Sequence, residues 1–453
     1  MTSIANSKGI IMLIIGDLIA YSFSLVLALT IRYGQIPSRI LFMDHIISFS
    51  ILFVVFIIVS FSAGFYDKQS AFILGKVQRI LFQVQIVNFL IGIAFFYFAP
   101  VVIAPKANLF LYFIISTIIL FIWRVIMFPV INMSRKQLAI IVGTGEDIKD
   151  LYDEINTNSR YGLIFKQHIQ PQSSVDQTVS KIAEAVKSSG ASIIVADLHD
   201  KNIESAMPFL YSLIFSGTQI IDASKLYESV FDRIPLSMVG ERWLVENSAM
   251  ALGSRRVYDT LKRLMDIIIA FITGLISLVF YPFVYLAIKL EDKGNVFISQ
   301  ERVGKNGKPI LITKFRSMTS DDSGSYGENG GKSILKVTSI GKCIRLTRID
   351  ELPQLWSVIK GNQSLIGPRP ELPALTKVYE KEIPYYNVRH LIKPGLSGWA
   401  QISHQAHPHH AVAVNDTRDK LSYDLYYIKN RSLMLDIRIA LQTAKSVLSR
   451  QGV

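Results

Sequence analysis

The chain has 453 residues, enough for about two or three domains, and its single cysteine, Cys343, excludes an intramolecular disulfide framework. Hydrophobic residues make up 50% of the chain and the mean hydropathy is +0.34, which excludes an ordinary soluble enzyme and indicates membrane segments. A net charge of +13 is typical of a membrane protein that uses Lys and Arg for topology and for anionic lipid headgroups. No nucleic-acid-binding motif is present, so nucleic acid is not an expected partner.

Four apolar runs come first, at 9–31, 46–65, 80–100 and 107–130, and each is long enough to cross about 30 Å of hydrocarbon. The first run is too long for the apolar core of a signal peptide and lacks a clear cleavage site, so we expect it to be retained. The sequence therefore predicts a four-helix transmembrane bundle over residues 1–135. Its ends should lie in the cytoplasm, on the side of the cations Lys68, Lys76, Arg79, Arg135 and Lys136.

Residues 136–250 predict a small Rossmann-like α/β domain with a parallel sheet. The run QLAIIV precedes Gly143-Thr-Gly145, and SIIVAD (192–197) and QIID (219–222) follow with helical stretches between them. The third glycine of a dinucleotide fingerprint would fall at Ile148, so the fingerprint is degenerate. The pattern favours an empty or regulatory site, and the ligand of this domain stays open.

The apolar segment 264–290 has two interpretations. Basic clusters flank it on both sides, so a crossing helix would place one cluster on the wrong face of the membrane. A re-entrant helix, broken at Tyr281-Pro282, keeps both clusters in the cytoplasm, because a proline removes a backbone donor and interrupts the helix. A plain spanning helix that tolerates its proline is the alternative.

Hydropathy falls after this segment, and residues 294–453 predict a compact unit at the membrane surface, with a Gly- and Ser-rich loop at 319–333. Within this unit stands RLTRIDELPQLWSVIKGNQSLIGPRPELP (345–373). Its apolar spacing predicts a short helix that begins near the adjacent acids Asp350 and Glu351 and stops at Gly361. Acids at that position can simply complement the helix dipole.

The cations nearby favour a catalytic role instead. They outnumber the two carboxylates, which indicates that an anionic substrate completes the charge balance. The candidate phosphate-binding residues are Lys314, Arg316, Arg345, Arg348, and Arg369 with its preceding Pro368. Adjacent helical residues diverge, so the two acids should have separate roles, one as a nucleophile and one as a ligand of Mg²⁺. The pattern is typical of phosphoryl transfer.

Residues 256–453 resemble the bacterial sugar transferases, the monotopic polyprenyl-phosphate phosphoglycosyl transferases. The resemblance rests on KRLMDIIIA, QERVGKNGKPILITKFRSM, the 345–373 stretch, IKPGLSGWAQIS and KLSYDLYYIKNRSLMLDI. It implies an α-rich catalytic domain with a re-entrant membrane helix, on the cytoplasmic face of a bacterial inner membrane. The four spans and the middle domain are similar to those of long-form members, which initiate exopolysaccharide, capsule or O-antigen synthesis.

The resemblance also implies a reaction. A hexose-1-phosphate passes from a UDP-sugar to undecaprenyl phosphate through a covalent aspartyl intermediate, with release of UMP. Asp350 matches the nucleophile, Glu351 the Mg²⁺ ligand, and Lys314, Arg345, Pro368 and Arg369 match phosphate-contacting positions. UDP-glucose and UDP-galactose are the donors that the resemblance suggests, and homodimer formation stays open.

Two positions depart from the family pattern. Tyr281-Pro282 stands where a Ser-Pro break is usual, and His404-Gln405 stands where many members have Gly-Arg. The second departure leaves the sugar and nucleotide preference open. Zinc ligation by the nearby histidines is not expected, because no thiolate or carboxylate accompanies them at ligand spacing.

Two other functions stay as alternatives. A membrane-anchored nucleotide-sugar dehydratase or epimerase would need an intact glycine fingerprint and a Tyr-x-x-x-Lys pair, and only Tyr258/Lys262 and Tyr285/Lys289 have that spacing. A transporter or scaffold would need polar residues within the spans, and apart from Asp17 almost none are expected there.

Overall fold

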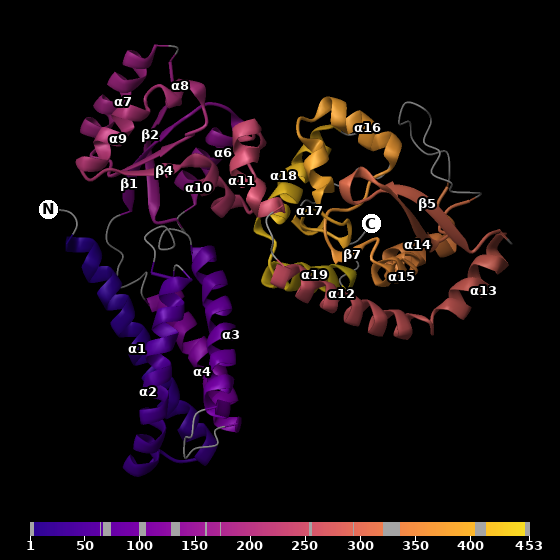
Figure 1. Ribbon diagram of the computed structural model, residues 1–453, viewed down its shortest axis with the longest axis horizontal. Coiled ribbons are helices and arrows are strands. Elements are labelled where there is room, and N and C mark those ends of the chain that lie inside the picture. The colour runs from indigo at the N-terminus through magenta and orange to yellow at the C-terminus, as the bar shows by residue number, and fades with distance from the viewer. Residues whose placement is uncertain are drawn as a thin grey trace. The chain divides into compact units, whose positions relative to one another are not determined.

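The computed structural model describes residues 4–63, 65–66, 74–98, 106–127, 136–158, 161–172, 174–252, 256–292, 294–319, 336–403 and 414–448. The chain forms two compact units, Met1–Val230 and Phe231–Val453 (Figure 1). The predicted cations Lys68 and Arg135 lie outside the described residues, as do most of the 319–333 loop and His404-Gln405.

The first unit begins with a helical bundle, which confirms the predicted four apolar helices. It comprises α1 (Ile4–Tyr33), α2 (Arg39–Ser62), α3 (Leu74–Phe98) and α4 (Lys106–Phe121), the last continued by the π-helical segment η2 (Ile122–Met127). Each holds a stretch of 19 to 23 residues that is long and apolar enough to cross a membrane. Aromatic side chains fill the centre of the bundle, where Phe49 packs on Phe53, Phe96 and Tyr112.

The bundle interior is more polar than the sequence analysis expected, and the expectation that Asp17 would stand nearly alone is wrong. Arg124 of η2 is buried and donates from Nε to Asp17 Oδ1 at 2.9 Å, and Tyr66 donates to Oδ2 at 2.7 Å. Further along, Asn88 donates to Tyr21 at 3.2 Å and Gln85 to Ser116 at 3.1 Å. Buried polar groups in a bundle need such partners, because lipid offers none.

The first unit continues with an all-parallel sheet, as predicted, in the order β2-β1-β3-β4. The elements are β1 (Gln137–Val142), α6 (Glu146–Thr157), β2 (Leu163–Ile169), α7 (Val175–Ser189), β3 (Ile193–Ala196), α8 (Lys201–Glu204), α9 (Met207–Phe215), β4 (Gln219–Asp222) and α10 (Ala223–Phe231). Every residue of β3 is buried, which is typical of a parallel strand covered on both faces. Figure 1 shows helices on both faces of this sheet.

Ile148 explains in structural terms why the glycine fingerprint is broken. Its side chain is fully buried in the first turn of α6, and a Cβ added to Gly143 would lie 3.0 Å from it. The side chain therefore fills the space where the third glycine of a fingerprint would permit close approach.

The second unit carries the predicted catalytic motifs. After α11 (Glu241–Leu252) come α12 (Arg256–Ser277), α13 (Tyr281–Asp292), the antiparallel pair β5 (Phe297–Val303) and β6 (Pro309–Phe315), α14 (Ser339–Leu346) and the 3₁₀ turn η5 (Ile349–Glu351). Then follow α15 (Gln354–Lys360), β7 (Ser364–Ile366), α16 (Pro373–Glu382), η6 (Tyr386–Leu391), β8 (Gly395–Ser397), α17 (Trp399–Ser403), α18 (Val414–Asn430) and α19 (Leu433–Leu448). Most of its core lies among α16, η6, α17, α18 and α19.

Residues 231–244 pack within this second unit. Asp232 accepts from Tyr426 at 2.8 Å and pairs with Arg438 at 3.2 Å, and Trp243 is buried in the same core as α18. The predicted boundaries at 135, 250 and 256 stay predictions. Residues before position 250, such as Ile234 and Trp243, belong to the core of the second unit.

Helices α12 and α13 form a bent pair, with 57° between their axes. Four consecutive backbone N–H groups, from Leu278 to Tyr281, bond three residues back, so the break leaves these donors satisfied. Pro282 follows in the first turn of α13, where a missing N–H costs little. The Tyr281 ring packs edge-on against Phe315, with ring centroids 4.9 Å apart.

The buried ion pair in the bundle gives a testable prediction. Arg124→Leu should lower the melting temperature of the detergent-solubilised protein, because it leaves Asp17 buried without its counter-ion, a cost of about 3 to 5 kcal/mol. The double variant Asp17→Leu/Arg124→Leu should recover most of that loss in thermal unfolding followed by size-exclusion chromatography. A double variant that is no more stable than Arg124→Leu would contradict this account.

Candidate active site

The two predicted catalytic acids lie in the 3₁₀ turn η5, just before α15. Arg348, the residue before this turn, has φ 53° and ψ 21°, a left-handed conformation that is uncommon outside glycine. Such strained residues are concentrated at functional sites. The helix that follows ends at Gly361 with φ 92°, as its sequence predicted.

Glu351 is enclosed by two of the predicted cations. Arg369 donates to Glu351 Oε1 at 2.7 Å, and Arg348 donates to Oε2 at 3.4 Å. Burial raises the pKa of Glu351, but the two guanidinium groups outweigh burial and hold the pKa below its usual range. Glu351 is therefore a carboxylate at neutral pH.

Asp350 is buried, with 7% of its surface exposed. Unlike Glu351, it has no guanidinium group bonded to it among the described contacts. Burial and the adjacent Glu351 charge raise the pKa of Asp350 to about 6, although Lys314, Arg345 and Arg369 act in the opposite direction. The site thus pairs a carboxylate of raised basicity with one that is locked in an ion pair.

The other predicted cations reach this turn from separate elements. Lys314 comes from β6 and Arg345 from the last turn of α14, so segments on both sides of the 320–335 stretch contribute. Arg316 is buried instead against Gly294, where an added Cβ would lie 2.0 Å from its guanidinium. The prediction that these residues bind phosphate stays a prediction.

Close backbone packing holds the Pro368-Arg369-Pro370 segment. Gly395 donates from its backbone to the Pro368 carbonyl at 3.0 Å, and β7 and β8 pair in parallel beside it. An added Cβ at Gly395 would lie 2.1 Å from the nitrogen of Gly367, and one at Gly398 would lie 2.5 Å from the Gly367 oxygen. The glycines of the KPGLSGW stretch therefore allow two backbones to meet directly under the segment.

Helix α12 is fastened to this site by two residues that the sequence analysis did not single out. Arg263 donates to the carbonyls of Val358 and Ile359 at 2.6 and 2.7 Å, which caps the C-terminal end of α15. Asp266 accepts from Ser364 Oγ at 2.7 Å and from the backbone of Leu365 at 3.2 Å. Both lie in KRLMDIIIA, and pairing across about 100 residues leaves no local pattern by which to find them.

The donor chemistry of the turn fits Mg²⁺. No cluster of three or more His, Cys, Asp or Glu is arranged to hold a metal in the part of the chain that the structure describes. Mg²⁺ does not need one, since it commonly binds one or two carboxylates together with substrate phosphates and water. Each oxygen of Glu351 has a second lone pair beyond its arginine contact.

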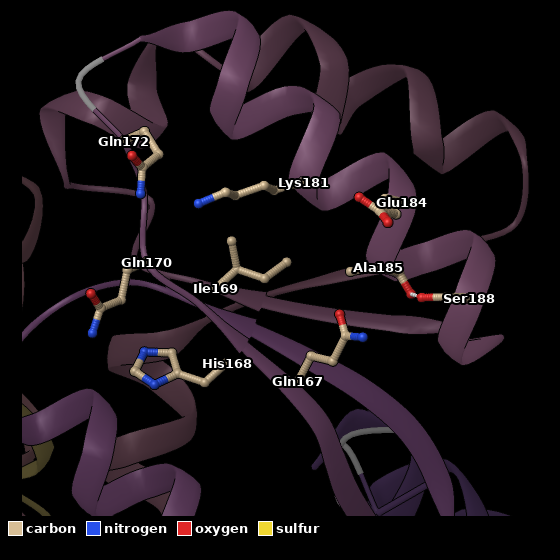
Figure 2. A pocket seen from close by; sticks show the side chains of 9 residues that line it. All are labelled: Gln167, His168, Ile169, Gln170, Gln172, Lys181, Glu184, Ala185 and Ser188. Atoms are coloured by element: carbon tan, nitrogen blue, oxygen red, sulfur yellow. Dashed lines mark hydrogen bonds between the residues drawn. The ribbon is translucent and has the colours of Figure 1, made fainter.

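A separate hollow of about 490 Å³ lies in the first unit, between β2, the loop after it and α7. Figure 2 shows Gln167, His168 and Lys181 among the side chains around it. None of the residues that line this hollow is a predicted site residue, so the hollow is not part of the candidate site at the η5 turn.

Comparison with known proteins identifies the family. Residues 257–450 match the model of the family described as bacterial sugar transferase. The exopolysaccharide production protein PSS of Rhizobium leguminosarum bv. phaseoli is 39% identical over 194 residues, which is 42% of this chain and 96% of that protein. The chain belongs to the bacterial sugar transferase family.

Two relatives that are longer than the Rhizobium protein are named for an activity. The UDP-N-acetylgalactosamine-undecaprenyl-phosphate N-acetylgalactosaminephosphotransferase of Aeromonas hydrophila is 36% identical over 260 residues, 57% of this chain and 59% of that protein. The UDP-glucose:undecaprenyl-phosphate glucose-1-phosphate transferase of Xanthomonas campestris pv. campestris is 37% identical over 167 residues, 37% of this chain and 34% of that protein. The match thus spans about a third to three fifths of these relatives.

The raised pKa of Asp350 predicts a gain in stability when its charge is removed. A folded-state pKa near 6, above the unfolded value near 3.9, means that the folded protein loses stability as the pH rises from about 4 to 6. Asp350→Asn should therefore raise the free energy of unfolding by on the order of 2 kcal/mol above pH 6, and by nothing below pH 4.

The measurement is denaturant unfolding of the detergent-solubilised protein at pH 4, 6 and 8. Asp259→Asn is the matched control, because this carboxyl group is 54% exposed and should change stability by less than about 0.5 kcal/mol. A loss of stability in Asp350→Asn at pH 8 would contradict the assigned pKa.

Proposed function

We propose that this protein transfers a hexose-1-phosphate from a UDP-sugar to undecaprenyl phosphate and releases UMP. The observation that carries the proposal is the η5 turn, where Asp350 has raised basicity beside an arginine-locked Glu351. The names of the Aeromonas and Xanthomonas relatives supply the substrate classes. The sugar stays open, since these two relatives are named for different ones.

The reaction has two displacement steps. A carboxylate oxygen of Asp350 bonds to the β-phosphorus of the UDP-sugar as the bond from that phosphorus to UMP breaks, and UMP leaves. A phosphate oxygen of undecaprenyl phosphate then attacks the same phosphorus, the acyl phosphate bond breaks and the Asp350 carboxylate returns. Burial leaves the Asp350 oxygen less stabilised by water and therefore more nucleophilic than an exposed carboxylate.

The cations around the turn stabilise the phosphate charge. Lys314, Arg345 and Arg369 all act on Asp350, so an anion bonded to that residue lies within the same field. Mg²⁺ held by Glu351 and the substrate phosphates would neutralise charge on the diphosphate. The Arg369 side chain is 44% exposed, so its guanidinium can contact Glu351 and an incoming phosphate while the backbone stays in place.

The bent pair α12–α13 is the segment that we propose re-enters the membrane. Its outer face is apolar over both arms, with Phe271, Ile272, Phe283 and Leu286 all more than half exposed. Its charged residues at both ends belong at the lipid surface, and the break at 278–280 allows the chain to return to its starting side. We place the catalytic unit on the cytoplasmic face of a bacterial inner membrane, where nucleotide sugars are available.

A dehydratase or epimerase is less well supported. Tyr258 and Lys262 have the required spacing, but both contact the buried Asp436, at 2.9 and 3.5 Å, so they are engaged in packing α12 against α19. The family match lies in the second unit and supports the transfer reaction. The polar interior of the bundle leaves open an additional role in transport.

The chemistry is tested by trapping the covalent intermediate. Purified protein with Mg²⁺ and a UDP-sugar, without lipid, should release up to one equivalent of UMP and gain the mass of that donor's sugar phosphate on the peptide that contains Asp350. Added undecaprenyl phosphate should restore turnover, and EDTA should stop it. Asp350→Asn should lower turnover by at least about 10³-fold, because the nucleophile is lost. Wild-type turnover in that variant would reject the nucleophile assignment.

The activity should also rise with pH around 6, because only the ionised Asp350 attacks phosphorus. A pH profile of kcat/KM that is flat between pH 5 and 8 would contradict this.

The membrane course of α12–α13 is tested with cysteine labelling. Cys343 is exposed and is the chain's single cysteine, so the wild type gives a reference label in the catalytic unit. In a Cys343→Ser background, Arg256→Cys and Lys289→Cys should react with a membrane-impermeant maleimide from the same side as Cys343. Reaction of the two introduced cysteines from opposite sides would establish a spanning helix.

A further inference from the structure

The segment of residues 368–371 is held from outside through its carbonyl oxygens. Two of its residues are prolines, which have no N–H, so contacts to the carbonyls largely decide where the backbone lies. All four carbonyls accept a hydrogen bond. In order along the segment, the donors are the backbone N of Gly395 at 3.0 Å, Arg389 at 2.9 Å, Arg302 at 3.4 Å and the backbone N of Val303 at 2.9 Å.

Arg389 is the donor at the residue that matters most, because it bonds the carbonyl of Arg369 itself. Its side chain is 5% exposed and pairs with Asp424, which is 2% exposed, at 2.8 Å. It also donates to Tyr386. One planar guanidinium thus reaches a carboxylate, a phenol and a backbone carbonyl, which the single amino group of a lysine cannot do in the same geometry.

We propose that Arg389, fixed by Asp424, is a positioning residue for Arg369 in the transfer reaction, an inference that rests on the proposed function. It holds the Arg369 backbone so that the guanidinium meets Glu351 on one side and leaves its remaining donors for the substrate phosphate. The chain of contacts runs from α18 through η6 to the η5 turn, and each link is a hydrogen bond or an ion pair.

Stability alone does not account for this arrangement. A buried ion pair seldom makes a protein more stable than an apolar pair of the same volume would, because both charges lose their hydration. Its effect is to fix geometry, and here the fixed atom is the carbonyl of a residue that contacts a catalytic carboxylate. A displacement of about 1 Å at such a position can cost on the order of 100-fold in rate.

A kinetic double-mutant cycle tests the coupling. Arg389→Lys keeps the charge but loses the fork, and should lower kcat/KM for UMP release by about 10- to 100-fold, mainly through kcat. In an Arg369→Ala background the same substitution should have an effect below about 3-fold, because the residue it positions is absent. Independent, additive effects would overturn the proposal.

Arg431→Lys is the matched control. Arg431 is also largely buried and pairs with a carboxylate of the same unit, Asp259 at 3.6 Å, and its described contacts do not involve residues 368–371. The control should change kcat/KM by less than about 2-fold. A control loss as large as that of Arg389→Lys would show that any buried arginine in this unit has the same effect, and would overturn the positioning role.

A second readout does not depend on activity. Phenylglyoxal modifies exposed guanidinium groups, and mass spectrometry measures its rate at Arg369 in the resting protein. Arg389→Lys should raise that rate at least about 5-fold as the contact with Glu351 loosens, and Tyr386→Phe, which keeps the ion pair, should raise it by less. An unchanged rate in both variants overturns the positioning role even if the enzyme is active. A wild type that releases no UMP rejects the proposed function, while the labelling result still decides the positioning role.

Discussion

Two carboxylates on adjacent residues repel each other, and the second unit is built around that repulsion. Asp350 and Glu351 share one short turn with little water around them, so both cannot be ionised at low cost unless cations lie close. Arg348 and Arg369 pair with Glu351 directly, whereas Lys314, Arg345 and Arg369 act on Asp350 through their charge. The result is an asymmetric pair in which one carboxylate stays fixed and the other remains basic. In the reaction that we propose, the basic carboxylate would be the nucleophile and the fixed one the Mg²⁺ ligand.

The same turn is tied to the helix pair that carries the apolar surface. Arg263 and Asp266 lie on the inner side of α12 and bond the end of α15 and strand β7, the two elements that follow the η5 turn. The outer side of α12 exposes Ile268, Phe271 and Leu275. One helix therefore exposes an apolar surface on one side and supports the site on the other. If α12 re-enters the membrane as we propose, this arrangement would set the depth of the site relative to the lipid.

The sequence predicted those features that depend on neighbouring residues. The four apolar helices follow from run length, the parallel sheet from alternation, and the end of α15 from Gly361. The sequence could not predict features that depend on distant pairing. The contact of Gly367 with Gly395 and the bond from Arg389 to the Arg369 carbonyl join residues about 20 or more positions apart. Gln85, Asn88 and Arg124 lie within the apolar runs, so the sequence itself showed that the spans carry polar residues besides Asp17, although it did not show how these residues pair.

The long-range contacts also explain how a proline-rich segment can serve as a rigid support. Pro368 and Pro370 restrict the backbone dihedral angles but donate no hydrogen bonds, so they stiffen the segment without determining where it lies. Placement comes from the glycine contacts beneath it and from the buried pair of Arg389 and Asp424 behind it. The two prolines make the segment stiff, which is a local property of the sequence. The position of the segment depends on contacts with β8, η6 and α18 together. The position of Arg369, between two prolines, therefore depends on the distant elements that hold its carbonyl.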